Sequence, residues 1–173
     1  TGPLRMVPAQ RKRAGYEDAL RSALPDRPLQ VFETLYSYEG GTIAAGRLID
    51  QGCTGIVCGS DIMALGVISG ARGRGLSVPH DLSVIGYDDS ALIPMTTPPL
   101  TTVRQPVAAI CRAAVTTLMS AIADEDVPDT EMLFAPDLIV RGSTAPVPRS
   151  PAADGVSATR SAPVAPPSRP VAS

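Results

Sequence analysis

The chain has 173 residues, of which 44% are hydrophobic and 3% are aromatic, with no Trp. This length suffices for one domain with a buried core built from Ala, Val, Leu and Ile rather than from aromatic rings. The net charge of −2 and the isoelectric point of about 5.3 argue against a general polyanion-binding surface. No apolar run approaches the ~18–20 residues of a membrane span and the first residues do not read as a signal peptide, so we expect no membrane partner.

Helical and strand patterns alternate along the chain. Apolar spacing of three and four residues predicts helices at Ala9–Leu24, Glu39–Gln51, Asp61–Arg74 and Pro106–Ala123. Short β-branched runs predict strands at Leu29–Leu35, Thr54–Gly59, Leu82–Tyr87 and Leu100–Val103, with a last extended segment at Thr130–Val140. This alternation predicts an α/β fold in which helices flank a parallel sheet.

The composition divides the chain into two parts. Residues 1–145 carry the alternating pattern, and we expect them to form one domain. Residues 146–173 hold seven of the 18 prolines with much Ala and Ser, which predicts a disordered tail. The chain does not open with Met, so we expect a fragment whose start lies upstream. The three cysteines, Cys53, Cys58 and Cys111, have no metal-ligand spacing and fit reduced thiols in a cytoplasmic protein.

Polar and aromatic side chains follow three of the expected strands. They are Tyr36-Ser37-Tyr38, Ser60-Asp61 and Asp88-Asp89. Because the carboxyl ends of parallel strands lie along one edge of a sheet, these groups can converge on one cleft. A carboxylate that accepts hydroxyl hydrogen bonds, beside an aromatic ring that stacks on C–H groups, makes a carbohydrate site.

Simpler roles compete for most of these residues. Asp61 is expected to cap the helix that follows it, although Ser60 can also serve as the cap. Asp89 is likewise expected to cap a short turn at Ser90–Ile93. Asp88 has no such local role, which favours a ligand contact. The rings of Tyr36 and Tyr38 are equally consistent with half-buried residues at a strand end.

A basic triplet, Arg11-Lys12-Arg13, falls near the start of the first expected helix. Cations there oppose the helix dipole at a small cost. A solvated charge run is the expected outcome for the triplet. The alternative is that one of the three points into the cleft and donates to a ligand.

Catalytic and metal-binding patterns do not stand out. His80 is the only histidine, so no Ser-His-Asp or Cys-His arrangement is evident, and neither GxxxxGK[ST] nor HExxH occurs. The paired acids Asp88-Asp89 and the run Asp124-Glu125-Asp126 can mimic a metal site, and the run is better explained as a solvated helix end. We therefore expect no enzyme activity, no metal and no cofactor.

Several separate motifs give the chain a resemblance to a known family. In chain order they are Gly2-Pro3, Ala14-Gly15-Tyr16, Glu39-Gly40-Gly41, SDIMALG at 60–66, VPHDLSVIGYDD at 78–89, LTTV at 100–103 with Gln105-Pro106, and LIVRGST at 138–144. Their sequence and order resemble the lactose-repressor (LacI/GalR) family of bacterial transcription regulators. The resemblance spans roughly Gly2–Ala145.

The resemblance implies a fold like that of periplasmic binding proteins, with two lobes and a ligand between them. This chain corresponds mainly to the second lobe, without the opening strand of that lobe. A helix-turn-helix headpiece, absent from this chain, would bind operator DNA, and the intact regulator would be a cytoplasmic homodimer. The effector would be a small molecule, such as a sugar or a sugar derivative. A sugar-binding protein of a transport system, with the same fold, remains the alternative.

The resemblance also assigns the ligand-binding residues. By position they are Lys12, Tyr36, Ser60, Asp88 and Gln105. Two of them depart from the family pattern. Lys12 stands where Arg is common, which removes a bidentate donor, and Ser60 stands where Asn is common, which removes an amide.

Overall fold

The computed structural model describes residues 1–127 and 129–146. The helices are α1 (Val7–Ala23), α2 (Tyr38–Asp50), α3 (Asp61–Arg72), the short 3₁₀ helix η1 (Ile93–Met95) and α4 (Val107–Ile122). The strands are β1 (Gly55–Val57), β2 (Ser83–Asp88), β3 (Thr101–Arg104) and β4 (Asp137–Ile139), in the spatial order β1-β2-β3-β4. The expected proline-rich tail lies outside the described residues, apart from Pro146.

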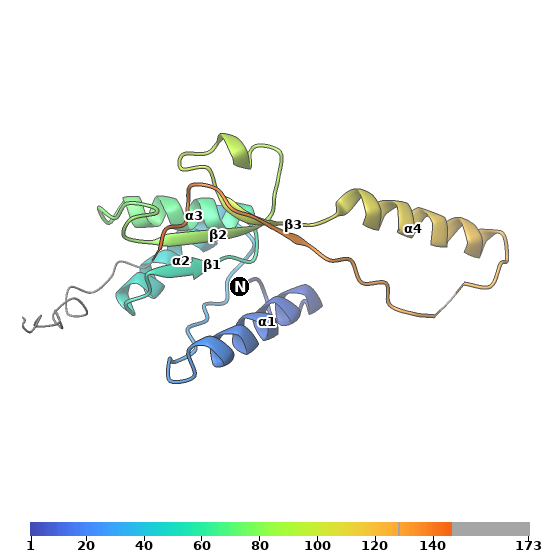
Figure 1. The fold of residues 1–173 in the computed structure, drawn as a ribbon, viewed down its shortest axis with the longest axis horizontal. Coiled ribbons are helices and arrows are strands. Elements are labelled where there is room, and N and C mark those ends of the chain that lie inside the picture. Colours follow the sequence, from blue (N-terminus) through green and yellow to red (C-terminus); the bar gives the residue numbers. More distant parts are fainter. Residues whose placement is uncertain (128, 147–173) are drawn as a thin grey trace, which may run out of the picture.

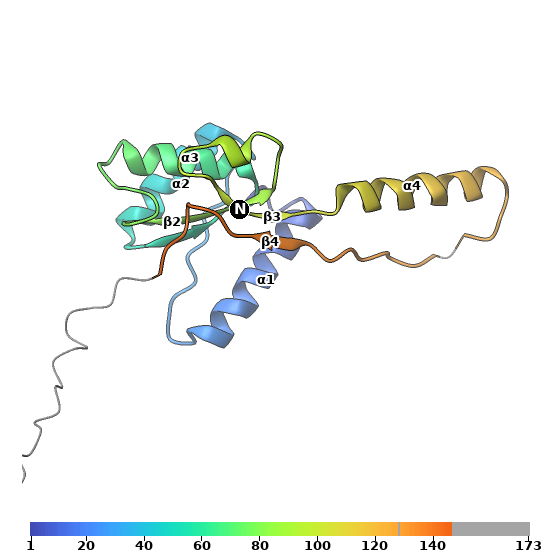
Figure 2. The same cartoon turned by 45° about the horizontal axis from the view of Figure 1, so that its top comes forward.

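The sheet is mixed rather than wholly parallel. β1, β2 and β3 are parallel neighbours, with Ile56 opposite Val84 and Gly86 opposite Thr102. The expected parallel sheet is confirmed for these three strands, and β4 adds an antiparallel strand beside β3. The physical reason is that the chain leaves the sheet along β3, forms α4 and returns beside the strand it left (Figure 2).

The core lies between the sheet and the pair α2 and α3. α3 packs on β2, and α2 packs on α3. The two helices approach closely because Gly41 faces the backbone of Met63 and leaves no room for a Cβ. Val84 and Gly86 of β2 face this core, so the alternation of the strand turns Ile85 and Tyr87 toward the opposite face, near α1 (Figure 1).

The segment Leu29–Leu35 is extended but is not a strand, contrary to the expectation from its composition. Its backbone bonds to Thr1 instead, since the amino group of Thr1 donates to the Phe32 carbonyl and Thr34 N–H donates to the Thr1 carbonyl. A hollow beside β1 is lined by residues 30–32 on one side and by Gly55, Ile56 and Val57 on the other. A strand needs a hydrogen-bonded partner along its length, and this segment finds one only at Thr1.

α4 and β4 extend away from the body of the molecule (Figure 1). No residue of α4 is buried, and Val115, Leu118 and Ile122 are each more than half exposed. Within the described part of the chain, no helix combines the length and apolar character that crossing a membrane requires.

Candidate ligand-binding site at the carboxyl edge of the sheet

Lys12 is the centre of a group of side chains at the carboxyl edge of the sheet. It lies in the second turn of α1, and its Nζ donates to the carbonyl of Gly59, directly after β1, at 2.9 Å. The same ammonium stands 3.6 Å from the ring centroid of Tyr87 and 5.7 Å from that of Tyr36. A charged group held against two rings and a carbonyl is partly desolvated and fixed in place.

The rest of the basic triplet behaves as a surface charge run. Arg13 forms an ion pair with Glu17 one turn along α1, and Arg11 pairs with Glu131. The expected solvated role therefore holds for the two arginines and is wrong for Lys12. Helical geometry explains the difference, because consecutive residues point about 100° apart around the helix axis.

Asp88 closes β2 and contacts the residue that follows β3. The side-chain amide of Gln105 donates to Asp88 Oδ1 at 2.8 Å. Asp88 has φ of 114° and Asp89 has φ of 55°, in the left-handed region that non-glycine residues seldom adopt. Such backbone strain is concentrated at functional sites, where the surrounding structure holds it in place.

Tyr36 brings an aromatic ring and an unpaired hydroxyl to the same group. Its side chain is half-buried, and its hydroxyl is buried with no hydrogen-bond partner in the part of the chain that the structure describes. A buried hydroxyl without a partner is unusual in a folded protein. Tyr38, the other candidate ring, begins α2 and is 40% exposed.

Ser60 is next to Gly59, whose carbonyl accepts the Lys12 bond, but its hydroxyl has a local partner. It caps α3 by accepting a hydrogen bond from the Met63 N–H at 3.4 Å. The structure therefore brings Lys12, Tyr36, Asp88 and Gln105 together and sets Ser60 beside them.

Burial shifts the two charged groups of this site toward their neutral forms. The pKa of Lys12 lies below that of a free lysine because of desolvation, which the charge of Asp88 partly offsets. The pKa of Asp88 is raised by desolvation, and the bond from Gln105 and the charge of Lys12 oppose this. Each charge thus stabilises the other in an environment that disfavours both.

Asp89 does not cap a turn, which corrects the expectation. η1 begins at Ile93 without a side-chain cap, while the carboxylate of Asp89 is 4% exposed and pairs with Arg104 at 2.6 Å and Arg141 at 2.7 Å. Burial alone would raise the pKa of Asp89, but the two guanidinium groups outweigh it and lower the pKa. Arg104 ends β3 and Arg141 follows β4, so Asp89 ties β2 to both strands that lead to α4.

Asp61 also differs from its expected role as the cap of α3. Ser60 is the cap, and the buried carboxylate of Asp61 accepts hydrogen bonds from the Thr102 hydroxyl at 2.5 Å and from Ser90 N–H at 2.8 Å. These bonds hold the chain directly after Asp88 and Asp89 against α3 and β3. Asp61 thereby positions the turn that carries Asp88 and Asp89.

Sequence reasoning missed Tyr87 as a member of this site. The signal was present, since period-two alternation puts Tyr87 on the face of β2 opposite Gly86, and Lys12 lies on the helix next to that face. The bonds from the Ser90 N–H and hydroxyl to the Asp61 carboxylate had no such signal, because they join positions 29 residues apart.

The hollow beside β1 is distinct from this edge of the sheet, although Lys12 and Gly59 line both. Its other walls are mainly apolar, including Phe32, Ile56 and Val67. Among residues 1–127 and 129–146, no three His, Cys, Asp or Glu side chains are grouped as a metal site would require.

Similarity to known proteins identifies the family of the chain. Residues 5–144 match the periplasmic binding protein-like domain family. A regulator of Streptomyces limosus, described as an uncharacterized HTH-type transcriptional regulator in the aml 5′ region, is 57% identical over 148 residues, which are 83% of this chain and 42% of that protein. The chain belongs to the LacI/GalR family of transcriptional regulators.

Solved structures of LacI/GalR proteins have the same fold. A complex of the regulator CelR with cellobiose superimposes with a TM-score of 0.77 and 30% identity, covering 83% of this chain and 45% of CelR. The Lac repressor dimer bound to operator and the anti-inducer ONPF gives 0.75 and 29%, covering 83% of this chain and 50% of the repressor. This chain thus spans about half the length of the LacI/GalR proteins that it matches.

Proposed function

We propose that residues 1–145 form the effector-binding domain of a cytoplasmic, homodimeric LacI/GalR regulator whose operator DNA is bound by a headpiece elsewhere in the full protein. The effector is a carbohydrate held by Lys12, Tyr36, Asp88 and Gln105, with Ser60 beside them. Its binding alters the affinity of the regulator for operator DNA. No catalytic role is proposed.

The chemistry of the site supports an uncharged, hydroxyl-rich effector. Lys12 and Asp88 carry opposite charges that offset each other, so an ionic ligand would leave one unit of charge uncompensated in a partly desolvated site. The bond from Gln105 uses Asp88 Oδ1, and a carboxylate has acceptor capacity for further hydroxyl donors. The free acceptor capacity of Asp88 beside the ammonium of Lys12 is the observation that carries the proposal most directly, because sugar hydroxyls donate to a carboxylate and accept from an ammonium.

A sugar-binding protein of a transport system is the second candidate, since it uses the same fold. The relatives favour the regulator, because the Streptomyces limosus protein is named as a transcriptional regulator and the two solved structures are regulators. A helix-turn-helix sequence in the full-length gene would separate the candidates directly.

The ligand site is tested by titrating the full-length protein with a panel of neutral sugars that includes cellobiose and ribose. For whichever sugar binds, Asp88→Asn and Asp88→Ala should weaken binding by about 1.5–3 kcal/mol, the usual loss for a hydrogen bond to a charged group. Both variants should keep operator binding and lose the response to the sugar.

Asp18→Asn is the matched control, because this carboxylate of α1 is 79% exposed and pairs only loosely with Arg21 at 3.7 Å. It should bind the sugar like the wild type. Wild-type affinity in Asp88→Ala, or no binding of any sugar in the panel, would contradict the proposal.

A further inference from the structure

Lys12 is the only lysine in the chain, in which Lys and Arg together number 15. Every other cationic side chain apart from His80 is an arginine. Lysine and arginine are not equivalent in such a setting, because an ammonium is a compact point charge on a flexible stem, whereas a guanidinium is a rigid planar fork. The single lysine also stands where the sheet edge, α1 and the rings of Tyr36 and Tyr87 meet.

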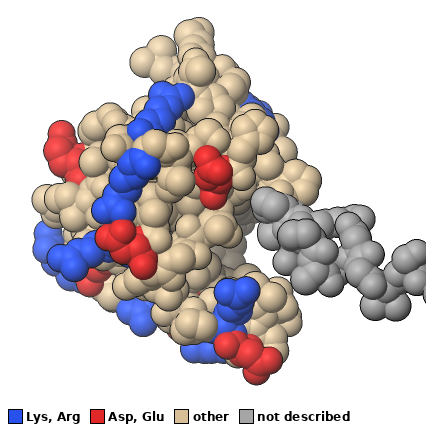
Figure 3. Space-filling view, turned by 90° about the vertical axis from the view of Figure 1, so that its left-hand side faces the viewer, with Lys and Arg blue, Asp and Glu red and all other residues tan. Residues whose placement is uncertain are grey.

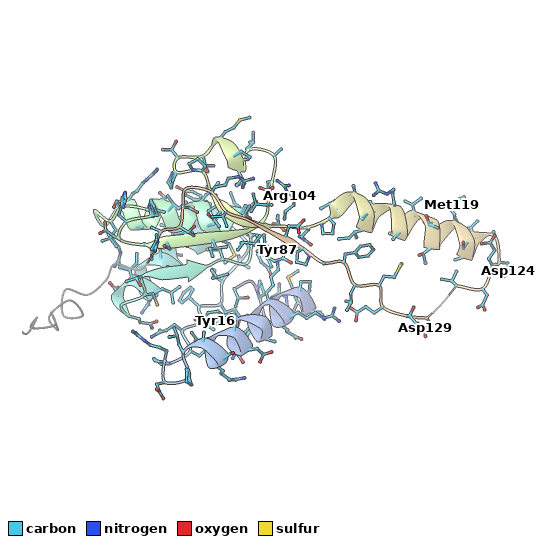
Figure 4. The ribbon with its side chains drawn as sticks, in the orientation of Figure 1. Tyr16, Tyr87, Arg104, Met119, Asp124 and Asp129 are labelled. Carbon is cyan, nitrogen blue, oxygen red and sulfur yellow. The ribbon has the colours of Figure 1, made fainter. Side chains whose placement is uncertain are left out.

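The surroundings of the Lys12 ammonium are defined on two sides. Its Nζ donates to the Gly59 carbonyl at 2.9 Å, and it stands 3.6 Å from the ring centroid of Tyr87. The ring itself is on a rigid support, since Tyr87 lies in β2 and pairs in register with Val103 of β3. Figure 4 shows Tyr87 near the end of β2, on the side of the sheet next to α1.

We propose that Tyr87 is a positioning residue of the ligand site, whose ring holds the ammonium of Lys12 at the carboxyl edge of the sheet. The proposal rests on the function proposed above. It assigns Tyr87 a part in effector binding without direct contact with the effector.

The physical need for the ring follows from the nature of lysine. The four-carbon stem of Lys12 has many rotamers, and holding it in one of them costs side-chain entropy. A cation over the face of an aromatic ring is attracted by the ring quadrupole, and this attraction is strongest where water is excluded. Burial lowers the pKa of Lys12, so the ring also helps to keep the amine charged.

In this arrangement Tyr87 and Tyr36 have different roles. The face of Tyr87 is covered by Lys12, whereas Tyr36 lies farther from the ammonium, at 5.7 Å. Tyr36 is therefore the ring that remains for the ligand. One N–H of the Lys12 ammonium donates to the Gly59 carbonyl, and the Tyr87 ring covers another side of the ammonium. One direction remains in which the ammonium can donate a hydrogen bond to a ligand.

The test uses the full-length protein with isotopic labels in lysine only, and the signal of Lys12 is assigned by its loss in Lys12→Arg. The ring current of Tyr87 should shift the ε-methylene protons of Lys12 upfield in the wild type. Tyr87→Phe should keep both this shift and the affinity for the sugar that binds. Tyr87→Leu should lose the shift and weaken binding by about five- to thirty-fold, which corresponds to the range of a desolvated cation–π contact.

Tyr38→Leu is the control, because this ring is 40% exposed at the start of α2 and is not one of the two that face Lys12. It should change neither reading. An unchanged ε-methylene shift in Tyr87→Leu would overturn the proposal, and so would a lost shift with wild-type affinity. If no sugar binds the wild type, the proposed function fails, while the methylene shift still decides whether Tyr87 holds Lys12.

Discussion

Asp88 and Asp89 are consecutive residues whose carboxylates bind different parts of the molecule. Asp88 accepts the amide of Gln105 beside Lys12, whereas Asp89 pairs with the guanidinium groups of Arg104 and Arg141. Both residues have a positive φ, and the resulting turn of the chain directs the two carboxylates toward different partners. These two consecutive residues therefore link the candidate site to the strands on either side of α4.

Asp89→Asn should destabilise the fold. The carboxylate is almost fully buried, and its removal leaves the charge of Arg141, whose side chain is 15% exposed, without its partner. Breaking a fully buried ion pair costs about 3–5 kcal/mol. Because Arg104 is exposed to water, which can replace part of the lost interaction, we expect a loss of roughly 1–3 kcal/mol in the free energy of unfolding. Denaturant unfolding of the full-length protein and its variant measures the difference.

Arg104→Gln is the control for that variant, because the Arg104 side chain is 53% exposed and water can replace much of its interaction. Its effect should be clearly smaller than that of Asp89→Asn. An equal loss in both would show that the pairing with Arg141 is not the stabilising part.

The contribution of Asp89 should also depend on pH. Its pKa is lowered in the folded state, so its stabilisation is complete above the ordinary pKa of an aspartate and is lost as the pH falls through the lowered value. The difference in unfolding free energy between wild type and Asp89→Asn should therefore shrink on acidification. A constant difference from neutral pH down to below this pKa would contradict the ion-pair assignment.

Sugar binding should follow a bell-shaped pH profile. Asp88 has a raised pKa, so binding should fail on the acid side at a pH above the ordinary range of an aspartate. Lys12 has a lowered pKa, so binding should fail on the alkaline side below the ordinary range of a lysine. Isothermal titration across the pH range measures both limbs, and Lys12→Arg should move the alkaline limb upward. Alkaline limbs that coincide in the wild type and in Lys12→Arg would exclude Lys12 as its source.

The sequence predicted elements whose signal is local. Apolar spacing located α2 and α3, and β2 was recognised as a buried run ending in carboxylates. Leu29–Leu35 has strand composition but lacks a paired neighbour, and composition does not report pairing. The sequence likewise does not indicate the direction of β4, since it is fixed by where the chain returns after α4.

The contacts of the candidate site also include some that a local sequence pattern predicts and some that it does not. Residues at strand ends were found because topology brings such ends to one edge. The bonds from Ser90 and Thr102 to Asp61 join positions 29 and 41 residues apart, and no local pattern encodes them. Asp61 was consequently assigned to the nearest helix as a cap, although its partners lie on a loop and on another strand.

The 173-residue chain alone should not bind operator DNA specifically. Its isoelectric point is about 5.3, and on the face drawn in Figure 3 the Lys and Arg side chains lie in a broken line with Asp and Glu beside them. Specific binding requires a basic surface and groups that read base edges. An electrophoretic shift assay at physiological salt should be negative, and a sequence-specific shift would contradict this view.

The same chain in isolation should be poorly stable or self-associating. The apolar side chains of α4 are exposed, and the hollow beside β1 leaves that edge of the sheet uncovered by residues 30–32. Exposed apolar faces and unpaired strand edges favour association with a second copy. Calorimetry with light scattering tests this, and a cooperative transition of a monomer would count against it.

The two ion pairs of Asp89, with Arg104 and with Arg141, affect how β3 and β4 can move relative to each other. Because β3 and β4 are held at one point, they tilt together rather than slide past each other when that point moves. α4 has 16 residues and is about 24 Å long, so a tilt of about 5° at its base displaces its far end by roughly 2 Å. A small rotation at the turn that carries Asp88 and Asp89 would in this way be magnified along the length of α4.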